Sequence, residues 1–278
     1  MKKNIKNKHN YVASLIARKI LKYNSKCIIA IGIFGSVATN THNSFSDIDL
    51  VVITNKKIKQ SSKSFLINSY PTINKEYSQS YKDQKVTILI KFDKEVTKQL
   101  FSVGLRWTVE SASLLSVKVL YDPTNFFSRL ACSFKDKKNR RLLDHRFNIL
   151  ATRWLSIAYE FLGKLHGVEF TGAKAYIYGK EFIFCIANVI KAVNQDSFQN
   201  IYNFVEESKF ANEKPKLYYE LASKLLKNNM NKKIMKEAVL QLWSDAISFT
   251  DKHDIRLEVL RIKDLDSKLL NIFHENEA

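Results

Sequence analysis

Two short apolar runs with a polar segment between them form the most informative pattern in the chain. Residues 28–34 and 48–53 are rich in Ile and Val, which predicts two buried strands. Gly35-Ser36 stands where the first strand would turn into a helix. Asp47 and Asp49 are two residues apart at the start of the second strand, so both side chains are expected on the same face.

Apolar spacing predicts further helices and strands around this unit in the first half of the chain. An amphipathic helix from Tyr11 to Tyr23 is expected to pack on the sheet. Alternation from Val86 to Phe92 predicts a strand with Val86, Ile88, Ile90 and Phe92 on one face. The remaining expectations are a short helix at 64–70, a further strand within 72–81, a helix at 100–117 and extended chain at 118–121.

Beyond Asp122-Pro123 the pattern is helical only. Apolar residues at three- and four-residue steps predict one long amphipathic helix from Leu143 to Leu165, and Ala175 to Val193 is apolar nearly all round, as in a buried helix. Further helices are expected at 199–207, 216–227, 231–250 and 254–273. The predicted fold class is therefore α+β, with a mixed-sheet domain over residues 10–122 and an α-helical bundle over residues 123–278.

Composition favours an ordered protein. Hydrophobic residues make up 45% of the 278-residue chain, which contains only 7 Gly and 3 Pro, so two modest domains can be filled. The three cysteines, Cys27, Cys132 and Cys185, are far apart and have no CxxC spacing, which argues against a disulfide framework or a zinc site. No long uncharged apolar stretch occurs, so we expect a cytoplasmic protein that does not use a membrane.

The net charge of +18 favours polyanionic partners. The same sequence is rich in Lys, Asn, Ile and Tyr, a bias that AT-rich coding produces without selection for binding. The charge is therefore a supporting argument for a nucleic-acid partner and does not establish one.

The polar segment between the two strands has the residues of a nucleoside triphosphate site. Backbone N–H groups at a Gly-Ser turn into a helix can bind phosphate oxygens. Two adjacent carboxylates, such as Asp47 and Asp49, repel each other and are stabilised by a cation between them. Mg²⁺ prefers a few carboxylates together with substrate phosphates. The combination predicts a site for Mg²⁺ and a nucleoside triphosphate.

The segment Phe34-Gly35-Ser36, ten residues, then Asp47-Ile48-Asp49-Leu50 resembles the signature of the DNA polymerase beta-like nucleotidyltransferase superfamily. The resemblance implies that Gly35 and Ser36 bind the β- and γ-phosphates of a nucleoside triphosphate, with ATP as the expected one. It also implies that Asp47 and Asp49 are catalytic Mg²⁺ ligands. The implied reaction transfers a nucleoside monophosphate to an acceptor hydroxyl, and pyrophosphate leaves.

The chain departs from this superfamily at a third carboxylate, which most active relatives place on the strand beside the Asp-x-Asp strand. Here Thr87 or Lys85 occupies that position. Three alternatives stay open at this point: Asp83, Asp93 or Glu110 fills the role; two carboxylates are sufficient, because positioning and charge neutralisation supply most of the catalysis; or the site is degenerate.

The order of a mixed-sheet domain and a helical bundle also resembles kanamycin nucleotidyltransferase and related antibiotic nucleotidyltransferases. In such relatives a basic residue from the bundle often contacts the phosphates, and Lys174 and Lys180 are the candidates here. The implied acceptor is a small molecule such as an antibiotic, or a tRNA, since some bacterial toxins of the superfamily nucleotidylate tRNA. A polycationic aminoglycoside fits a protein of charge +18 less well than an RNA does.

Two other functions are open from the sequence. One is a catalytically weakened member that binds nucleotide or RNA, motivated by the missing carboxylate at Thr87. The other is a HEPN-like ribonuclease, because Arg140 and His145 have the Arg-x4-His spacing of that family. The basic run from Lys135 to Arg141 is compatible with binding to a nucleic acid backbone.

Overall fold

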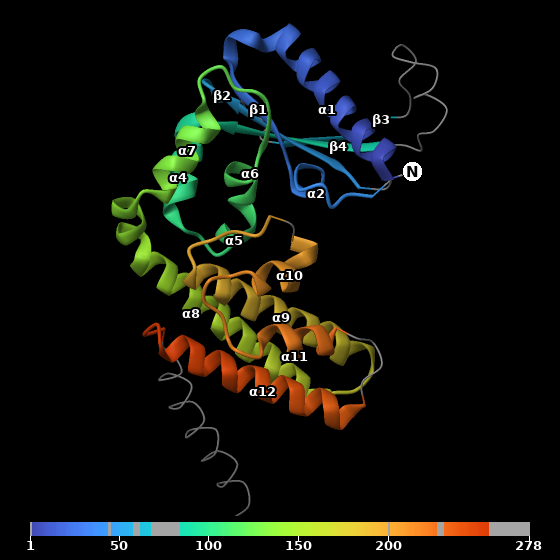
Figure 1. Ribbon diagram of the computed structural model, residues 1–278, viewed down its shortest axis with the longest axis vertical. Coiled ribbons are helices and arrows are strands. Elements are labelled where there is room, and N and C mark those ends of the chain that lie inside the picture. The colour runs from blue at the N-terminus through green and yellow to red at the C-terminus, as the bar shows by residue number, and fades with distance from the viewer. Residues whose placement is uncertain are drawn as a thin grey trace, which may run out of the picture. The chain divides into compact units, whose positions relative to one another are not determined.

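The computed structural model shows two compact units (Figure 1). The sheet unit comprises Met1–Leu143 and Ser197–Tyr202, and the helical unit comprises Asp144–Asp196 and Asn203–Ala278. The structure describes residues 2–43, 46–57, 62–67, 84–199, 201–226 and 231–255.

A five-stranded mixed sheet forms the centre of the sheet unit. Its strand order is β3-β4-β2-β1-β5; β2 and β4 are parallel, and the other neighbouring strands are antiparallel. With the mostly helical second half of the chain, this sheet confirms the predicted α+β class. The strands are β1 (Ile28–Phe34), β2 (Ile48–Thr54), β3 (Ser62–Ile67), β4 (Gln84–Phe92) and β5 (Lys118–Tyr121).

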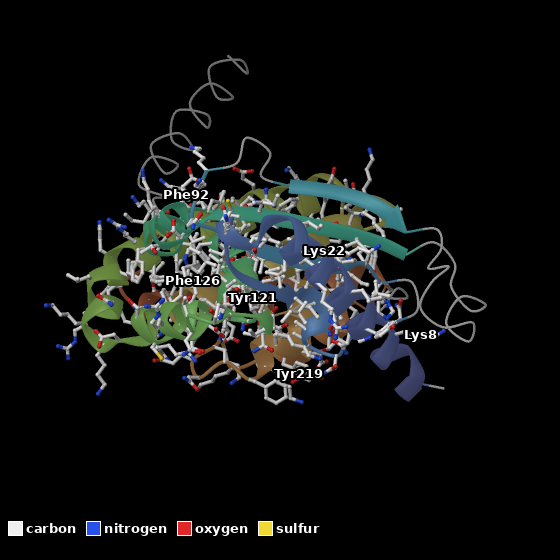
Figure 2. The ribbon with its side chains drawn as sticks, turned by 90° about the horizontal axis from the view of Figure 1, so that it is seen from above. Lys8, Lys22, Phe92, Tyr121, Phe126 and Tyr219 are labelled. Carbon is white, nitrogen blue, oxygen red and sulfur yellow. The ribbon has the colours of Figure 1, made fainter. Side chains whose placement is uncertain are left out.

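One face of the sheet is covered by helix α1 (Lys2–Asn24), as Figures 1 and 2 show. Its apolar residues Val12, Ala13 and Ile16 pack in one buried cluster with Ile33 of β1 and Leu50 of β2. The helical spacing of these residues places them on a single face of α1, and their burial holds the helix against the strands. The predicted helix at 11–23 is confirmed and begins earlier.

The opposite face of the sheet is contacted by α7 (Phe126–Lys135). A Cβ atom added to Gly32 would lie 3.5 Å from Phe127 of α7 and 2.0 Å from Val117, so glycine is required for this close packing. Because side chains alternate along a strand, Gly32 and its partner Val51 face the same side as Asp49. The helices of this side therefore border the surface on which the candidate site lies.

Two expectations for the sheet unit are wrong. The described part of the segment 64–70 belongs to strand β3, because its backbone pairs with β4 in the sheet. The single helix expected at 100–117 is divided into α4 (Asp93–Ser102), α5 (Trp107–Glu110) and α6 (Ala112–Leu115). The first break follows from Val103, which adopts a left-handed conformation (φ 49°) and ends α4. The strand expected within 72–81 lies outside the described residues.

The helical unit begins within α8 and contains the α-helices that follow it in the described residues. The long helix expected at 143–165 and the buried helix expected at 175–193 are confirmed as α8 and α9, and α9 is apolar over most of its surface. No described helix is long and apolar enough to cross a membrane. The helices are α8 (Lys137–Gly167), α9 (Gly172–Val193), α10 (Phe204–Lys209), α11 (Tyr218–Leu225) and α12 (Lys232–Asp251).

The division between the compact units falls inside α8, whereas the sequence pattern places a domain boundary at 122/123. Helix α7 follows that boundary in sequence and yet contacts β1 and α6 in the sheet unit. The domain limits 10–122 and 123–278 stay a prediction. Most of the helix expected at 254–273 lies outside the described residues.

Candidate active site

The turn from β1 into the short helix α2 (Gly35–Ala38) brings Gly35 against a carboxylate. Gly35 has φ +70°, a conformation that side-chain-bearing residues rarely adopt. Phe34 pairs with Asp49 across β1 and β2, and a Cβ atom added to Gly35 would lie 3.0 Å from Oδ2 of Asp49. Both the backbone conformation and the close approach therefore require glycine at this position.

Two threonines after α2 hold the carbonyl groups of the turn. The hydroxyl of Thr39 donates to the carbonyl oxygen of Gly35 at 3.2 Å and to that of Ser36 at 3.3 Å. The backbone N–H of Thr41 donates to the Ser36 carbonyl at 3.0 Å. The sequence analysis did not identify these positioning residues, although a Thr four residues after a turn glycine is well placed for such a bond.

Asp47 and Asp49 lie together at the beginning of β2, as the two-residue spacing predicts. Burial of the Asp49 carboxyl, and secondly the charge of Asp47, raise the pKa of Asp49 from 3.8 to about 6, while Lys85 acts in the opposite direction. The ionised carboxylate of Asp49 is thus disfavoured in the metal-free protein. A cation bound beside the pair would remove this cost.

Lys85 contacts the carboxylate pair from the neighbouring strand. The parallel register pairs Ile48 with Val86, which puts Lys85 beside Asp47, and the Lys85 ammonium donates to Oδ2 of Asp47 at 2.9 Å. This hydrogen bond, and then the charge of Asp47, raise the pKa of Lys85; Asp49 and Tyr202 add smaller contributions. The sequence analysis placed Lys85 near the site and missed its bond to Asp47, because the register was unknown.

The described residues offer no third carboxylate beside Asp47 and Asp49. Thr87 is the residue that pairs with Asp49 on β4. Asp93 follows the opposite end of β4, six residues beyond Thr87, or roughly 20 Å along an extended strand. Its Oδ1 accepts from the backbone N–H of Lys94 at the start of α4, at 2.7 Å. Asp83 lies outside the described residues.

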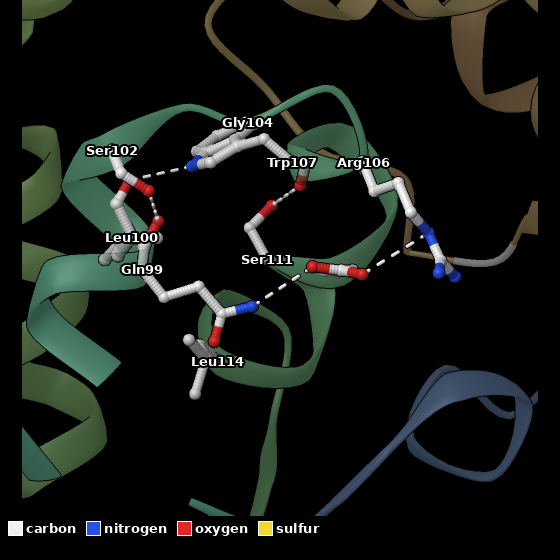
Figure 3. Close-up of a pocket in the computed structure, with 9 residues that line it drawn as sticks. Gln99, Leu100, Ser102, Gly104, Arg106, Trp107, Ser111 and Leu114 are labelled. Atoms are coloured by element: carbon white, nitrogen blue, oxygen red, sulfur yellow. Dashed lines mark hydrogen bonds and ion pairs between the residues drawn. The ribbon is translucent and has the colours of Figure 1, made fainter. Parts of the chain in front are cut away.

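Glu110 belongs to a separate small pocket of the sheet unit, with a volume of about 90 Å³ (Figure 3). One carboxylate oxygen of Glu110 accepts from Gln99 at 3.2 Å, and the other pairs with Arg106 at 3.3 Å. Lys91, which donates to Gln99 at 2.7 Å, is four residues along β4 from Thr87. Within the described ranges no group of three or more His, Cys, Asp or Glu residues forms a metal cluster. Glu110 therefore does not complete the Asp47–Asp49 pair.

The two candidate phosphate-binding lysines lie on helix α9 of the helical unit. Lys174 is in its first turn, Lys180 is six residues further on, and both side chains are exposed. Their role at the triphosphate stays a prediction.

A glycine turn against a pair of strand carboxylates is the arrangement expected of a domain that transfers nucleotides. Residues 16–106, which include Gly35, Ser36, Asp47 and Asp49, match the family model described as nucleotidyltransferase domain. This match supports a nucleotidyltransferase domain at residues 16–106. The resemblance to this superfamily is confirmed, whereas the kanamycin type of specificity is not.

Comparison with solved structures gives a partial similarity over most of the chain. A nucleotidyltransferase-like protein from Exiguobacterium sibiricum 255-15, in a crystal structure, shares 12% sequence identity with a TM-score of 0.47. The similarity covers 85% of this chain and 75% of that chain. No curated protein matches the sequence.

Proposed function

We propose that the protein transfers a nucleoside monophosphate from a nucleoside triphosphate, with ATP as the expected donor, to an acceptor hydroxyl in a Mg²⁺-dependent reaction. The observation that supports this best is the contact between the Gly35 turn and Asp49 across β1 and β2. It brings the Gly35 turn and the carboxylate pair to the same edge of the sheet.

Each part of the site has a distinct role in this proposal. The turn at Gly35 and Ser36 binds the β- and γ-phosphates, because the first amides of a helix have no partner within it and favour anions. The donor set fits a divalent cation: Asp47 and Asp49 are two hard oxygen ligands, and a cation bound beside them would offset the burial and the repulsion from Asp47 that raise the pKa of Asp49. Mg²⁺ held by these carboxylates would neutralise charge on the phosphates.

The acceptor that fits the protein best is an RNA such as tRNA. The chain carries a formal net charge of +18, which attracts polyanions and repels polycationic aminoglycosides. An antibiotic acceptor of low charge, such as a lincosamide, is the alternative within the same reaction class.

A second candidate function, a member that binds nucleotide without transferring it, is favoured by one observation. Thr87 pairs with Asp49 where a third acid would stand, and Lys85 contacts Asp47. In that case the protein would bind a triphosphate and Mg²⁺ with no turnover.

The ribonuclease alternative stays a prediction that rests on the spacing of two residues. Arg140 and His145 lie on the continuous helix α8, five residues apart. At 3.6 residues per turn this spacing separates their directions by roughly 140° around the helix axis. The two side chains therefore project from different faces of α8.

The test is a transfer assay with each common ribonucleoside triphosphate labelled at the α-phosphate, in the presence of Mg²⁺. Total tRNA, aminoglycosides and lincosamides serve as acceptors, and Asp47→Ala/Asp49→Ala serves as the control. Label that moves to RNA with the parent protein alone is the expected result. Binding of triphosphate without transfer to any acceptor would favour the second candidate. A parent protein that neither binds triphosphate nor transfers label would contradict the proposal.

A further inference from the structure

The ammonium of Lys85 occupies one side of the Asp47–Asp49 pair. Its Nζ lies 2.9 Å from Oδ2 of Asp47, and the side chains of Lys85 and Asp47 are 51% and 38% exposed. Strand β4 supplies Lys85 through the same parallel register that sets Thr87 opposite Asp49. A fixed positive charge is thus built into the site.

This arrangement limits the number of divalent cations that the site can bind. The two carboxylates and one ammonium carry a single net negative charge, which one divalent ion converts to a single positive charge. Two ions roughly 4 Å apart need anionic ligands for both, and neighbouring charges of like sign repel. Among the residues that the structure describes, no third His, Cys, Asp or Glu joins the pair, and Thr87 brings only a neutral hydroxyl.

We propose that the site takes a single divalent cation and that Lys85 supplies the second positive charge beside the transferred phosphates. The inference rests on the proposed function, because it concerns how the same carboxylate pair is neutralised. Lys85 competes with the metal for Asp47 while the nucleotide is absent. The ammonium that contacts Asp47 lies beside the carboxylate pair at which the triphosphate would bind.

Another lysine of the sheet unit provides a matched control. Lys57 pairs with Glu95 at 2.7 Å, and these side chains are 74% and 53% exposed. Replacement of Lys57 by glutamine removes the same charge and a comparable surface ion pair, at a position outside the candidate site. Effects of net charge alone would therefore be equal in Lys57→Gln and Lys85→Gln.

The experiment counts metal ions with Mn²⁺ as the probe. Electron paramagnetic resonance distinguishes an isolated Mn²⁺ ion from a spin-coupled pair, and it reports on binding without any catalytic turnover. The full-length parent, Lys85→Glu, Lys85→Gln and Lys57→Gln are measured with Mn²⁺, alone and with a non-hydrolysable triphosphate. Lys85→Glu places a third carboxylate beside Asp47, and the exposure of this position makes the variant compatible with folding.

The parent is expected to show an isolated ion with the triphosphate, and Lys85→Glu is expected to show a coupled pair. Without nucleotide, Lys85→Gln is expected to bind Mn²⁺ roughly two- to fivefold more tightly than the parent, because the exposed ion pair that competes with the metal for Asp47 is lost. The Mn²⁺ affinity of Lys57→Gln is expected to equal that of the parent. A coupled pair in the parent would overturn the inference and leave the proposed function intact. An isolated ion in Lys85→Glu, or no tightening in Lys85→Gln, would also overturn it. Absence of Mn²⁺ from the parent would overturn both the inference and the proposed function.

Discussion

Replacement of Asp49 by asparagine is expected to stabilise the metal-free protein at neutral pH. Burial and the charge of Asp47 raise the pKa of Asp49 from 3.8 to about 6. A pKa difference of one unit corresponds to about 1.4 kcal/mol, so ionised Asp49 lowers the free energy of unfolding by up to roughly 3 kcal/mol. Because the site is partly open to solvent, we expect a gain of about 1–3 kcal/mol in Asp49→Asn at pH 7.5.

The sign of the pH dependence follows from the raised pKa. The folded protein binds the Asp49 proton more tightly than the unfolded chain does. The stabilising contribution of protonated Asp49 is therefore present in full below pH 3.8 and is lost as pH rises through about 6. The stability of the parent relative to Asp49→Asn should therefore fall between about pH 4 and pH 7. Mg²⁺ should restore the stability of the parent at neutral pH and have no such effect on the variant.

Urea unfolding without metal, followed through Trp107 after replacement of Trp154 and Trp243 by phenylalanine, reports on the sheet unit. Asp47→Asn is the matched control. It loses the ion pair with Lys85 and relieves the repulsion on Asp49, so its net change is expected to stay within about 1 kcal/mol. An Asp49→Asn protein that is less stable than the parent at neutral pH, or a difference that does not depend on pH, would refute this reasoning.

Other predictions concern the turn, the helices that border the sheet, and strand packing. Gly35→Ala should lower the free energy of unfolding by about 1–2 kcal/mol and weaken triphosphate binding, because φ is +70° and the new Cβ would lie 3.0 Å from Asp49. Gly104→Ala is the control and should have little effect, because no atom lies within 4 Å of the added Cβ. Equal stability of the two alanine variants in urea would contradict this account. Trp107→Phe should lower the free energy of unfolding by about 1–2 kcal/mol, since the buried indole N–H donates to the Leu100 carbonyl at 2.8 Å. Thermal unfolding followed by circular dichroism tests this prediction, and an unchanged midpoint would count against it. Gly32→Ala should destabilise the sheet unit by about 1–3 kcal/mol, because its Cβ would lie 2.0 Å from a Val117 methyl that has to move. Hydrogen exchange of β1 amides should increase, and unchanged protection would contradict this account.

Much of the fold follows from local patterns. The strands of Ile and Val at 28–34 and 48–53 and the two long helices of the second half were predictable, because their apolar periodicity coincides with their burial. Strand β3 was not, since its pairing with β4 is a long-range contact that local propensity does not encode. The break after Ser102 depends on the left-handed conformation of Val103, a residue that seldom adopts it.

The candidate site was predictable where its residues are close in sequence. Gly35, Ser36, Asp47 and Asp49 lie on one strand–turn–strand unit, so their spacing alone brings them together. The bond between Lys85 and Asp47 depends on the register of two parallel strands. A shift of this register by one residue would place the Lys85 side chain on the opposite face of the sheet. The position of Asp93 at the far end of β4 required the same information.

Transfer of α-labelled nucleotide to tRNA by the parent and by Asp49→Asn tests the central claim most directly. Asp49→Asn is expected to retain the fold and removes one carboxylate of the proposed metal site, so urea unfolding of the variant distinguishes a loss of activity from a loss of structure. The account predicts label on RNA with the parent and a loss of at least about a hundredfold with the variant, as expected when a preorganised charge at the reacting phosphates is removed. Equal transfer by both proteins would contradict the assignment of the reaction to this carboxylate pair.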